Sequence, residues 1–312
     1  MPAEIYGERY QFLARSEVLT FEEIQRLARI FAKFGARKLR VTGGEPLVRA
    51  QLPQLIELLT AVEGIDDIAL TTNGYLLAAQ AKPLHDAGLD RVTVSLDSLD
   101  DNVFRQMNGR NFGIEPVLQG INAVERAGFK QIKINCVVQR GVNDQTIVDL
   151  ARHFKGTGHI VRFIEYMDVG TLNGWNLEQV VTAREILKTI SSTMPLEPVK
   201  ANYPGEVAKR YVYADGGGEI GIIASVSQPF CGDCTRARLS TDGRFVTCLF
   251  SSEGKDLRGP IRAGASDDDM MRLISTVWSN REDRYSEIRT SEMNVRGGKE
   301  EHSKIEMFRM GG

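Results

Sequence analysis

The sequence predicts an α/β protein whose main part is an incomplete parallel (β/α) barrel. Three observations lead to this fold class. Short β-branched runs alternate with amphipathic helical stretches, Gly, Asp or Asn marks each change between them, and the strands recur at intervals of about 23 to 40 residues. Such alternation favours parallel strands with right-handed crossovers, and this spacing suits a closed or partly closed barrel. A doubly wound sheet is the alternative arrangement.

The expected elements follow in chain order. Runs rich in Val, Ile, Leu and Thr predict strands at 38–42, 68–72, 91–95, 131–138 and 160–165. Apolar residues at helical spacing predict helices at 21–34, 52–62, 77–87, 101–107, 115–127, 145–154 and 182–193. After residue 195 the alternation weakens, and turns rich in Pro and Gly separate hairpin-like runs at 210–213 and 221–224. We therefore expect a barrel over residues 1–195 and a smaller region over 196–312.

Composition and charge narrow the function classes. The 312 residues carry a formal net charge of -2 at pH 7, so nothing global favours nucleic acid or a membrane surface as a partner. An anionic ligand would need a local cluster of Lys and Arg. No apolar run approaches transmembrane length, and the start Met1-Pro2-Ala3-Glu4 has no basic or apolar leader region. We expect a cytoplasmic protein, because few cysteines, most of them in one cluster, suit a reducing compartment.

Three of the four cysteines form a C-x2-C-x13-C pattern, namely Cys231, Cys234 and Cys248. Thiolates spaced in this way can meet at one metal centre, but three sulfurs fall one short of a closed tetrahedral site. Spacing alone leaves an iron-sulfur cluster and zinc equally open. The plainer readings are zinc completed by a distant His, buried small hydrophobes, or a disulfide with a spare thiol. The polar, turn-rich surroundings favour a metal, whereas Cys136 stands in an apolar strand and is expected in the core.

Polar residues recur where a parallel barrel presents its active-site mouth. Lys38, Arg40 and Thr42 share one side of the first strand, which is unusual for a strand buried on both faces. Similar candidates on later strands are Thr71, Ser95, Lys133, Arg162 and Met167. Taken singly, such a Lys can reach solvent, a Ser or Thr can cap a helix, and a Met can simply pack. Their agreement across successive strands predicts an anion-binding mouth, to which Arg236 and Arg238 add charge suited to a polyphosphate.

A glycine pair, Gly43-Gly44, followed by Glu45-Pro46, comes directly after the first of these strands. The glycines let the backbone approach a ligand closely, and the residue before the proline is held extended. With this motif the chain resembles the radical S-adenosylmethionine superfamily, and within it the GTP 3',8-cyclases of molybdenum cofactor biosynthesis. The resemblance covers essentially the entire chain. The motifs that carry it are 40–47, 71–74, 94–97, 162–168, the cysteine segment with Arg236-Ala237-Arg238, and the terminal Gly311-Gly312.

The resemblance implies a set of site residues. Cys231, Cys234 and Cys248 would hold a [4Fe-4S] cluster whose unliganded iron binds the guanine of GTP. The residues implied to contact GTP are Lys38, Arg40, Thr71, Lys133, Arg162, Arg236, Ala237 and Arg238. Those implied to contact S-adenosylmethionine are Gly43, Gly44, Glu45, Ser95 and Met167. The Gly311-Gly312 tail would reach the active site, and no residue is identified as a general acid or base.

The activity implied by the resemblance is the first step of molybdenum cofactor biosynthesis. S-adenosylmethionine, cleaved at a second [4Fe-4S] cluster that an external reductant supplies with electrons, would give a 5'-deoxyadenosyl radical. This radical would abstract the ribose 3' hydrogen of GTP, and the carbon radical would add to guanine C8 to give (8S)-3',8-cyclo-7,8-dihydroguanosine 5'-triphosphate. The protein would clamp the triphosphate, orient the guanine and exclude water and oxygen. The resemblance also allows a homodimer.

One departure from the family concerns the start of the chain. Family members carry an N-terminal C-x3-C-x2-C segment that ligates the second cluster and supplies the first barrel strand. The third of these cysteines is followed by Met-Pro, the two residues with which this sequence begins. We therefore expect a start assigned just after that cysteine, and a printed chain that is inactive without the missing ligands. Translating the DNA upstream of Met1 tests this expectation. The alternatives are a non-catalytic protein that binds GTP or a cluster, and a zinc-stapled structural protein.

Overall fold

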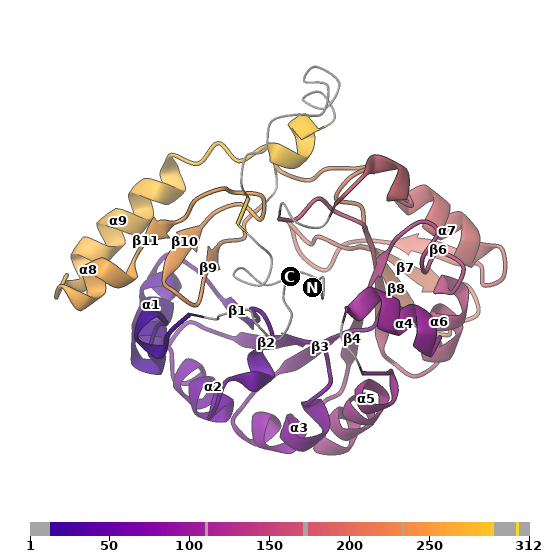
Figure 1. Cartoon of the computed structure of the whole chain (residues 1–312), viewed down its shortest axis with the longest axis horizontal. Helices are drawn as coiled ribbons and strands as arrows, with labels where there is room; N and C mark the ends of the chain where they lie inside the picture. The colour runs from indigo at the N-terminus through magenta and orange to yellow at the C-terminus, as the bar shows by residue number, and fades with distance from the viewer. Residues whose placement is uncertain (1–12, 110–111, 171–173, 233, 290–303, 306–312) are drawn as a thin grey trace.

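A curved sheet of eight strands organises the fold (Figure 1). The computed structural model describes residues 13–109, 112–170, 174–232, 234–289 and 304–305, so the Gly311-Gly312 tail lies outside the described residues. The strands follow the order β1-β2-β3-β4-β5-β8-β7-β6. Their bounds are β1 Lys38–Val41, β2 Asp67–Thr72, β3 Arg91–Ser95, β4 Ile132–Val138, β5 Ile160–Glu165, β6 Leu196–Val199, β7 Lys209–Tyr213 and β8 Glu219–Ile223.

The strands from β1 to β5 and then β8 run parallel to one another, whereas β7 and β6 extend the sheet as antiparallel strands. Every strand predicted up to residue 165 is present, so the predicted incomplete parallel barrel is confirmed. Within the described residues β1 pairs only with β2, and its other edge has no strand partner.

Helices cover the outer face of the sheet (Figure 1). They are α1 Phe21–Lys33, α2 Leu52–Thr60, α3 Leu77–Asp86, α4 Asp101–Asn108, α5 Glu115–Ala127, α6 Ile147–Phe154 and α7 Ala183–Ser191. Short 3-10 turns stand at Arg15–Glu17, Pro46–Val48 and Leu177–Gln179. The predicted helices are confirmed, with ends that differ by at most two residues. Capping boxes fix the starts of α1 and α7, where Thr20 and Thr182 each exchange hydrogen bonds with a Glu three residues later.

The pleat of the sheet separates two environments. In β4, Ile132, Ile134, Cys136 and Val138 are buried in the main apolar core beneath the helices. The residues between them line the concave side of the sheet. Cys136 is therefore a core residue, as predicted.

The segment after residue 195 first continues the sheet and then closes the ring. Its later elements are β9 Arg238–Leu239, β10 Arg244–Val246, β11 Lys255–Asp256, α8 Arg258–Arg262 and α9 Asp267–Ser279. A second apolar core joins them to α1, because Leu27 and Ile30 pack with Phe245 and Met270. Figure 1 shows α1 beside these elements at the left of the ring. The predicted division at residue 195 stays a prediction.

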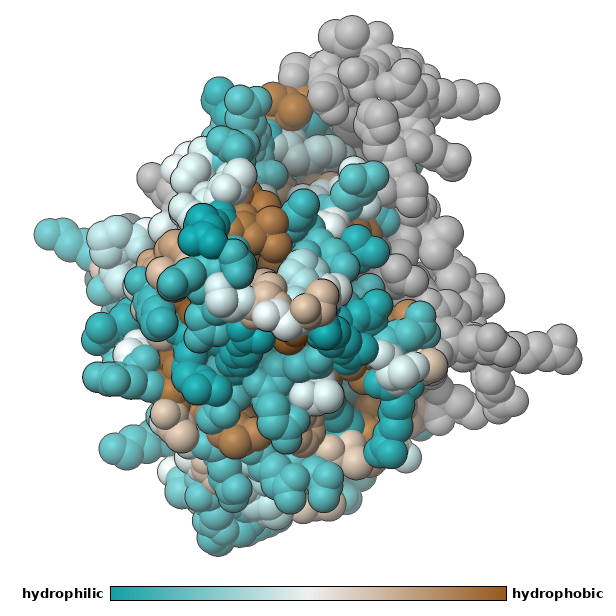
Figure 2. All heavy atoms as spheres, turned by 90° about the vertical axis from the view of Figure 1, so that its left-hand side faces the viewer, coloured by the Kyte–Doolittle hydropathy of each residue, from teal (hydrophilic) through white to brown (hydrophobic). Residues whose placement is uncertain are grey.

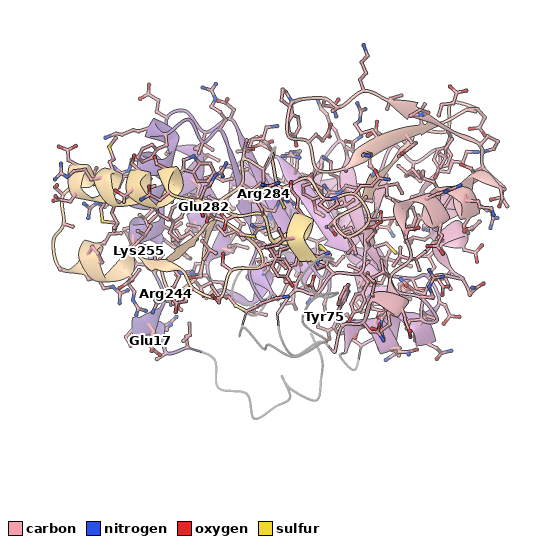
Figure 3. All side chains as sticks on the ribbon, turned by 90° about the horizontal axis from the view of Figure 1, so that it is seen from above. Glu17, Tyr75, Arg244, Lys255, Glu282 and Arg284 are labelled. Atoms are coloured by element: carbon pink, nitrogen blue, oxygen red, sulfur yellow. The ribbon has the colours of Figure 1, made fainter. Side chains whose placement is uncertain are left out.

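Polar contacts hold the same junction together. Arg26 of α1 pairs with Asp267 at 2.7 Å, and Arg262 pairs with Glu23 at 2.8 Å. Figure 3 shows Glu17 on the same side of the molecule as Arg244, and the backbone oxygen of Glu17 accepts a hydrogen bond from Arg258. The outward face of this junction is mostly hydrophilic, with small apolar spots (Figure 2). In the described part of the chain, no helix has both the length and the hydropathy that crossing a membrane requires.

Candidate functional site

A large open cavity of about 2790 Å³ lies along the concave side of the sheet, and residues of α1 and α2 also line it. Every residue named in the sequence as a candidate for binding GTP, S-adenosylmethionine or a metal lines it. They come from the parallel strands, from the loops that leave them and from the cysteine segment beyond β8. The fold therefore gathers into one space residues that lie up to about 200 positions apart in the chain.

A cluster of cations stands on the inner side of neighbouring strands. The strand register aligns Lys133 of β4 with Thr93 and Thr71, and aligns Arg162 of β5 with Asn135. Because alternate residues face the cavity, these side chains meet at similar heights.

The hydrogen bonds of this cluster are made to neutral groups. The Arg40 guanidinium donates to the Oγ1 of Thr71 at 2.8 Å and to the Oγ1 of Thr93 at 3.4 Å. Arg162 Nε donates to Asn135 Oδ1 at 3.0 Å. Among the residues that the structure describes, no carboxylate forms an ion pair with Lys38, Arg40, Lys133, Arg162 or Arg238.

The electrostatics of this cluster favour an anionic ligand. Burial and the positive charge of Arg162 lower the pKa of Lys133 to about 8. Burial and the neighbouring Arg40 lower the pKa of Arg162 to about 10. Burial lowers the pKa of Arg40 as well. Cations that depress one another's pKa in this way are stabilised when an anion enters among them.

The sequence reasoning missed three polar residues of this wall. Asn135 lines the cavity two residues from Lys133, and Thr93, two residues from Ser95, accepts a hydrogen bond from Arg40, so the period of the pleat could have found both. Arg91 also lines the cavity, but it pairs with Asp67, which neutralises its charge.

The loop after β1 is held in place by Glu45. Its Oε1 accepts hydrogen bonds from Thr72 Oγ1 at 2.7 Å and from the Leu47 N–H at 3.0 Å, and its Oε2 accepts one from the Asn73 N–H at 2.7 Å. These bonds use the carboxylate to join two neighbouring loops. Gly43 has φ of 141°, a region that a side chain rarely adopts. The backbone of Gly43 and Gly44 borders the cavity.

The loops after β3 and β5 also reach the cavity. Ser95, Asp97 and Met167 line it. Asp97 Oδ1 accepts a hydrogen bond from the Val137 N–H at 2.8 Å, and burial raises the pKa of this carboxyl to about 6. The sequence also makes Asp97 a candidate for the rim of the site beside Ser95, without assigning it a ligand.

Glu165 ends β5 as a buried structural carboxylate. Its Oε1 accepts hydrogen bonds from the Ala183 N–H at 2.7 Å and from Ser227 Oγ. Its Oε2 accepts from the N–H groups of Val226 at 2.7 Å and of Ser227 at 2.8 Å. The side chain is 0% exposed. Glu165 thus ties the end of β5 to the start of α7 and to the loop after β8.

A second buried carboxylate, Asp168, follows Met167. It pairs with Arg289 at 2.8 Å and with Lys304 at 2.7 Å, and it accepts a hydrogen bond from the Tyr285 hydroxyl. The Tyr285 ring stacks on Phe250, with ring centroids 4.7 Å apart. These contacts connect the end of β5 with the cysteine segment.

The three cysteines border the cavity with partly exposed, reduced thiols. The Cys234 N–H donates to the Cys231 oxygen at 3.2 Å, and the Phe250 N–H donates to Cys248 Sγ at 3.5 Å. Arg236 donates to Cys234 Sγ from Nε at 3.3 Å and from Nη2 at 3.2 Å. Burial acts to raise the pKa of Cys234, but the charge and hydrogen bonds of Arg236 outweigh it, so the pKa lies below its usual value. Burial raises the pKa of Cys248.

The arrangement of these thiols bears on the kind of metal centre. Among the described residues, no three ligating side chains stand close enough to share one metal ion. A [4Fe-4S] cluster takes each thiolate on a different iron, so its ligands stand farther apart than those of one zinc ion. Cys231, Cys234 and Cys248 line the cavity together with Arg236 and Arg238, so they are the residues that could hold a metal centre there. Figure 3 shows Glu282 and Arg284, which also line the cavity, near the middle of the molecule.

Comparisons with known proteins match both parts of the chain. The Radical SAM superfamily matches residues 6–154, and Molybdenum Cofactor Synthesis C matches residues 159–287. A GTP 3',8-cyclase of Xanthomonas campestris pv. campestris (strain 8004) is 51% identical over 312 residues, which cover 100% of this chain and 89% of that protein. A GTP 3',8-cyclase of Acidothermus cellulolyticus is 49% identical over 331 residues, with 100% and 91% covered. The solved structure of native anSMEcpe with bound AdoMet shares 17% identity at a TM-score of 0.45 and covers 56% of this chain and 50% of that one, a likeness that carries no argument.

Proposed function

This chain belongs to the GTP 3',8-cyclase family of the radical S-adenosylmethionine superfamily, and we propose that it binds and cyclises GTP. The proposed product is (8S)-3',8-cyclo-7,8-dihydroguanosine 5'-triphosphate, formed in the first step of molybdenum cofactor biosynthesis. Membership of the superfamily implies S-adenosylmethionine and a [4Fe-4S] cluster. When bound, these supply the radical that starts the reaction. The remaining tasks fall to residues of this chain.

One observation carries the proposal: in the described part of the chain, a cluster of cations that form no ion pair with a carboxylate shares a cavity with three free thiols. We assign the triphosphate to Lys38, Arg40, Lys133 and Arg162, because Arg and Lys bind phosphate through charge-assisted hydrogen bonds. Thr71 orients the Arg40 guanidinium. Arg236, Ala237 and Arg238 line the wall between these cations and the thiols, so we assign them to the nucleoside.

We assign S-adenosylmethionine to the ends of the parallel strands, where Gly43, Gly44, Ser95 and Met167 border the cavity. Glu45 contributes by holding the glycine loop against β2, since its carboxylate oxygens are taken up by Thr72, Asn73 and Leu47. The glycines offer backbone groups that a methionine amino or carboxyl group can reach.

We assign the substrate-side [4Fe-4S] cluster to Cys231, Cys234 and Cys248. The open coordination position of a cluster with three protein ligands would face the guanine. The reaction also needs an external reductant and a compartment where thiols stay reduced, for which the cytoplasm is our proposal. A homodimer stays a prediction.

A binding experiment on the full chain tests the proposed substrate. We expect anaerobically purified protein to bind GTP and to bind guanosine much more weakly, because the triphosphate carries most of the charge that meets the cation cluster. Equilibrium dialysis or calorimetry gives both dissociation constants. Equal affinity for guanosine and GTP would contradict the assignment of the cations to phosphate. The Lys209→Gln variant is the matched control for the Lys133→Gln variant described below. It should bind GTP as the unmodified chain does, because Lys209 lies at an exposed end of β7.

The pH dependence of GTP binding tests Lys133. The ammonium form binds phosphate, and its pKa in the free protein is about 8. Affinity should therefore fall as pH rises above about 8, by at least about tenfold in all, since a hydrogen bond to a charged group contributes about 1.5 to 3 kcal/mol. Dissociation constants measured from pH 7 to pH 9.5 at constant ionic strength check this. Lys133→Gln should bind more weakly at pH 7 and lose most of the slope, and an unchanged slope would rule out Lys133 as its source.

A further inference from the structure

The connection between β6 and β7 crosses to the opposite wall of the cavity. Asn202 through Ala208 line the same space as the cation cluster. The Tyr203 ring lies over Lys38, with Nζ 3.9 Å from the ring centroid. Lys38 is the first residue of β1, so the ring reaches the end of the barrel where this strand begins. A loop from the far edge of the sheet therefore covers the cation farthest from the glycine loop.

Hydrogen bonds fix the conformation of this connection. Arg210 of β7 donates to the Lys200 oxygen at 3.0 Å and to Asn202 Oδ1 at 2.9 Å, and it also pairs with Glu219 of β8. The Asn202 N–H donates to Glu206 Oε2 at 2.6 Å, and the Glu206 N–H donates to the Tyr203 oxygen at 3.2 Å. The turn thus closes on itself and is tied to the sheet at its base. Tyr203 and Glu206 both line the cavity from this turn.

The pair is suited to act on the cation cluster. The Glu206 carboxylate is held within the turn, where it accepts hydrogen bonds from the N–H and the side-chain amide of Asn202, and it lines the cavity. From there its negative charge raises the pKa values of Lys133 and Arg162 against the larger effect of burial. The Tyr203 ring provides the π face on which the Lys38 ammonium rests. The ring thus stands at the end of the row that Arg40 and Lys38 form along β1.

We propose that Tyr203 and Glu206 form a floor that sets the number of phosphates the site accepts. This inference rests on the proposed function, in which the triphosphate lies along Arg40, Lys133, Arg162 and Lys38. Lys38 stands two residues beyond Arg40 on β1, a rise of about 7 Å, so a phosphate chain that passes Arg40 ends near Lys38. A fourth phosphate would have to displace the Tyr203 ring and approach the Glu206 carboxylate. Ring and carboxylate thus act against longer anions by bulk and by like-charge repulsion.

The test compares two ligands that differ by one phosphate. Dissociation constants of GTP and guanosine 5'-tetraphosphate are measured on the full chain at one pH and one ionic strength. We expect the protein to prefer GTP by about tenfold, which corresponds to about 1.4 kcal/mol. Tyr203→Ala and Glu206→Gln should each reduce this preference at least about threefold, because removing one repulsive element restores part of the affinity for the rejected ligand.

The matched control is Tyr203→Phe, which keeps the ring and its contact with Lys38 and should keep the preference. Tyr203 is 45% exposed, so its truncation leaves the apolar cores intact, and a thermal melt verifies this. Glu206→Gln removes the charge and keeps the size of the side chain and one acceptor oxygen for the Asn202 N–H, and the same thermal melt verifies that the turn is retained. An unchanged preference in both Tyr203→Ala and Glu206→Gln overturns the floor. Failure of the unmodified protein to bind GTP at all would instead overturn the proposed function.

Discussion

Glu165→Gln is expected to lower the free energy of unfolding by about 3 kcal/mol, because it leaves buried donors without an acceptor. Both carboxylate oxygens accept hydrogen bonds, Oε1 from Ala183 and Ser227 and Oε2 from Val226 and Ser227. An amide has one acceptor oxygen. In either orientation of the amide, its NH2 group points at an N–H donor and cannot accept from it. The size of the side chain is unchanged, so the effect comes from the lost acceptor alone. Urea denaturation followed by circular dichroism measures the change.

Glu197→Gln is the matched control for this substitution. Glu197 lies exposed on β6, so the same chemical change there should alter stability by no more than about 0.5 kcal/mol. A Glu165→Gln variant within about 1 kcal/mol of the unmodified protein would show that water or a shifted backbone satisfies these donors. The end of β5 carries Met167, so the substitution should also weaken binding of S-adenosylmethionine.

Alanine in place of Cys231, Cys234 or Cys248 is expected to cause the largest change in cofactor content. Each thiolate would hold one iron of the proposed substrate-side cluster, so loss of one ligand should prevent stable assembly. Iron and acid-labile sulfide, measured after anaerobic reconstitution, should fall by about four atoms per chain in each variant.

Cys136→Ala is the matched control, because its thiol is buried in the core and hydrogen-bonded to the Asp97 oxygen at 3.4 Å, away from the other three. It should retain the iron of the unmodified chain, with a modest loss of stability from the small cavity. If the variants at the other three positions keep their iron, these cysteines do not hold the cluster. Zinc retained in place of iron would favour a structural metal instead.

The elements of the barrel could be predicted because their signals are local. The alternation of Ile132, Ile134, Cys136 and Val138 with polar residues indicates a strand and also which side of it faces the cavity. The capping sequence from Thr182 to Glu185 likewise indicates where α7 begins. Site residues on strands follow from the same period, so Lys133 and Arg162 could be named as candidates.

Contacts between distant segments could not be predicted in this way. Nothing in the run Tyr203-Pro204-Gly205-Glu206 indicates that it crosses to Lys38 on the other side of the barrel, because the path depends on the width of the finished sheet. The structural role of Glu165 could not be predicted either, because its hydrogen-bond partners are also distant in the sequence. A Glu at the end of a strand resembles a ligand-binding group until its partners after β8 are known.

The apolar core shared by α1 and the C-terminal elements has a consequence for synthesis on the ribosome. Leu27 and Ile30 acquire their partners Met270 and Ile274 only after some 240 further residues have been added. At 5 to 20 residues per second this interval lasts roughly 12 to 50 s. During that time one face of an early helix stays uncovered while the strands between fold. The nascent chain is then most exposed to chaperones and to aggregation, and the ring closes as one of the last events of folding.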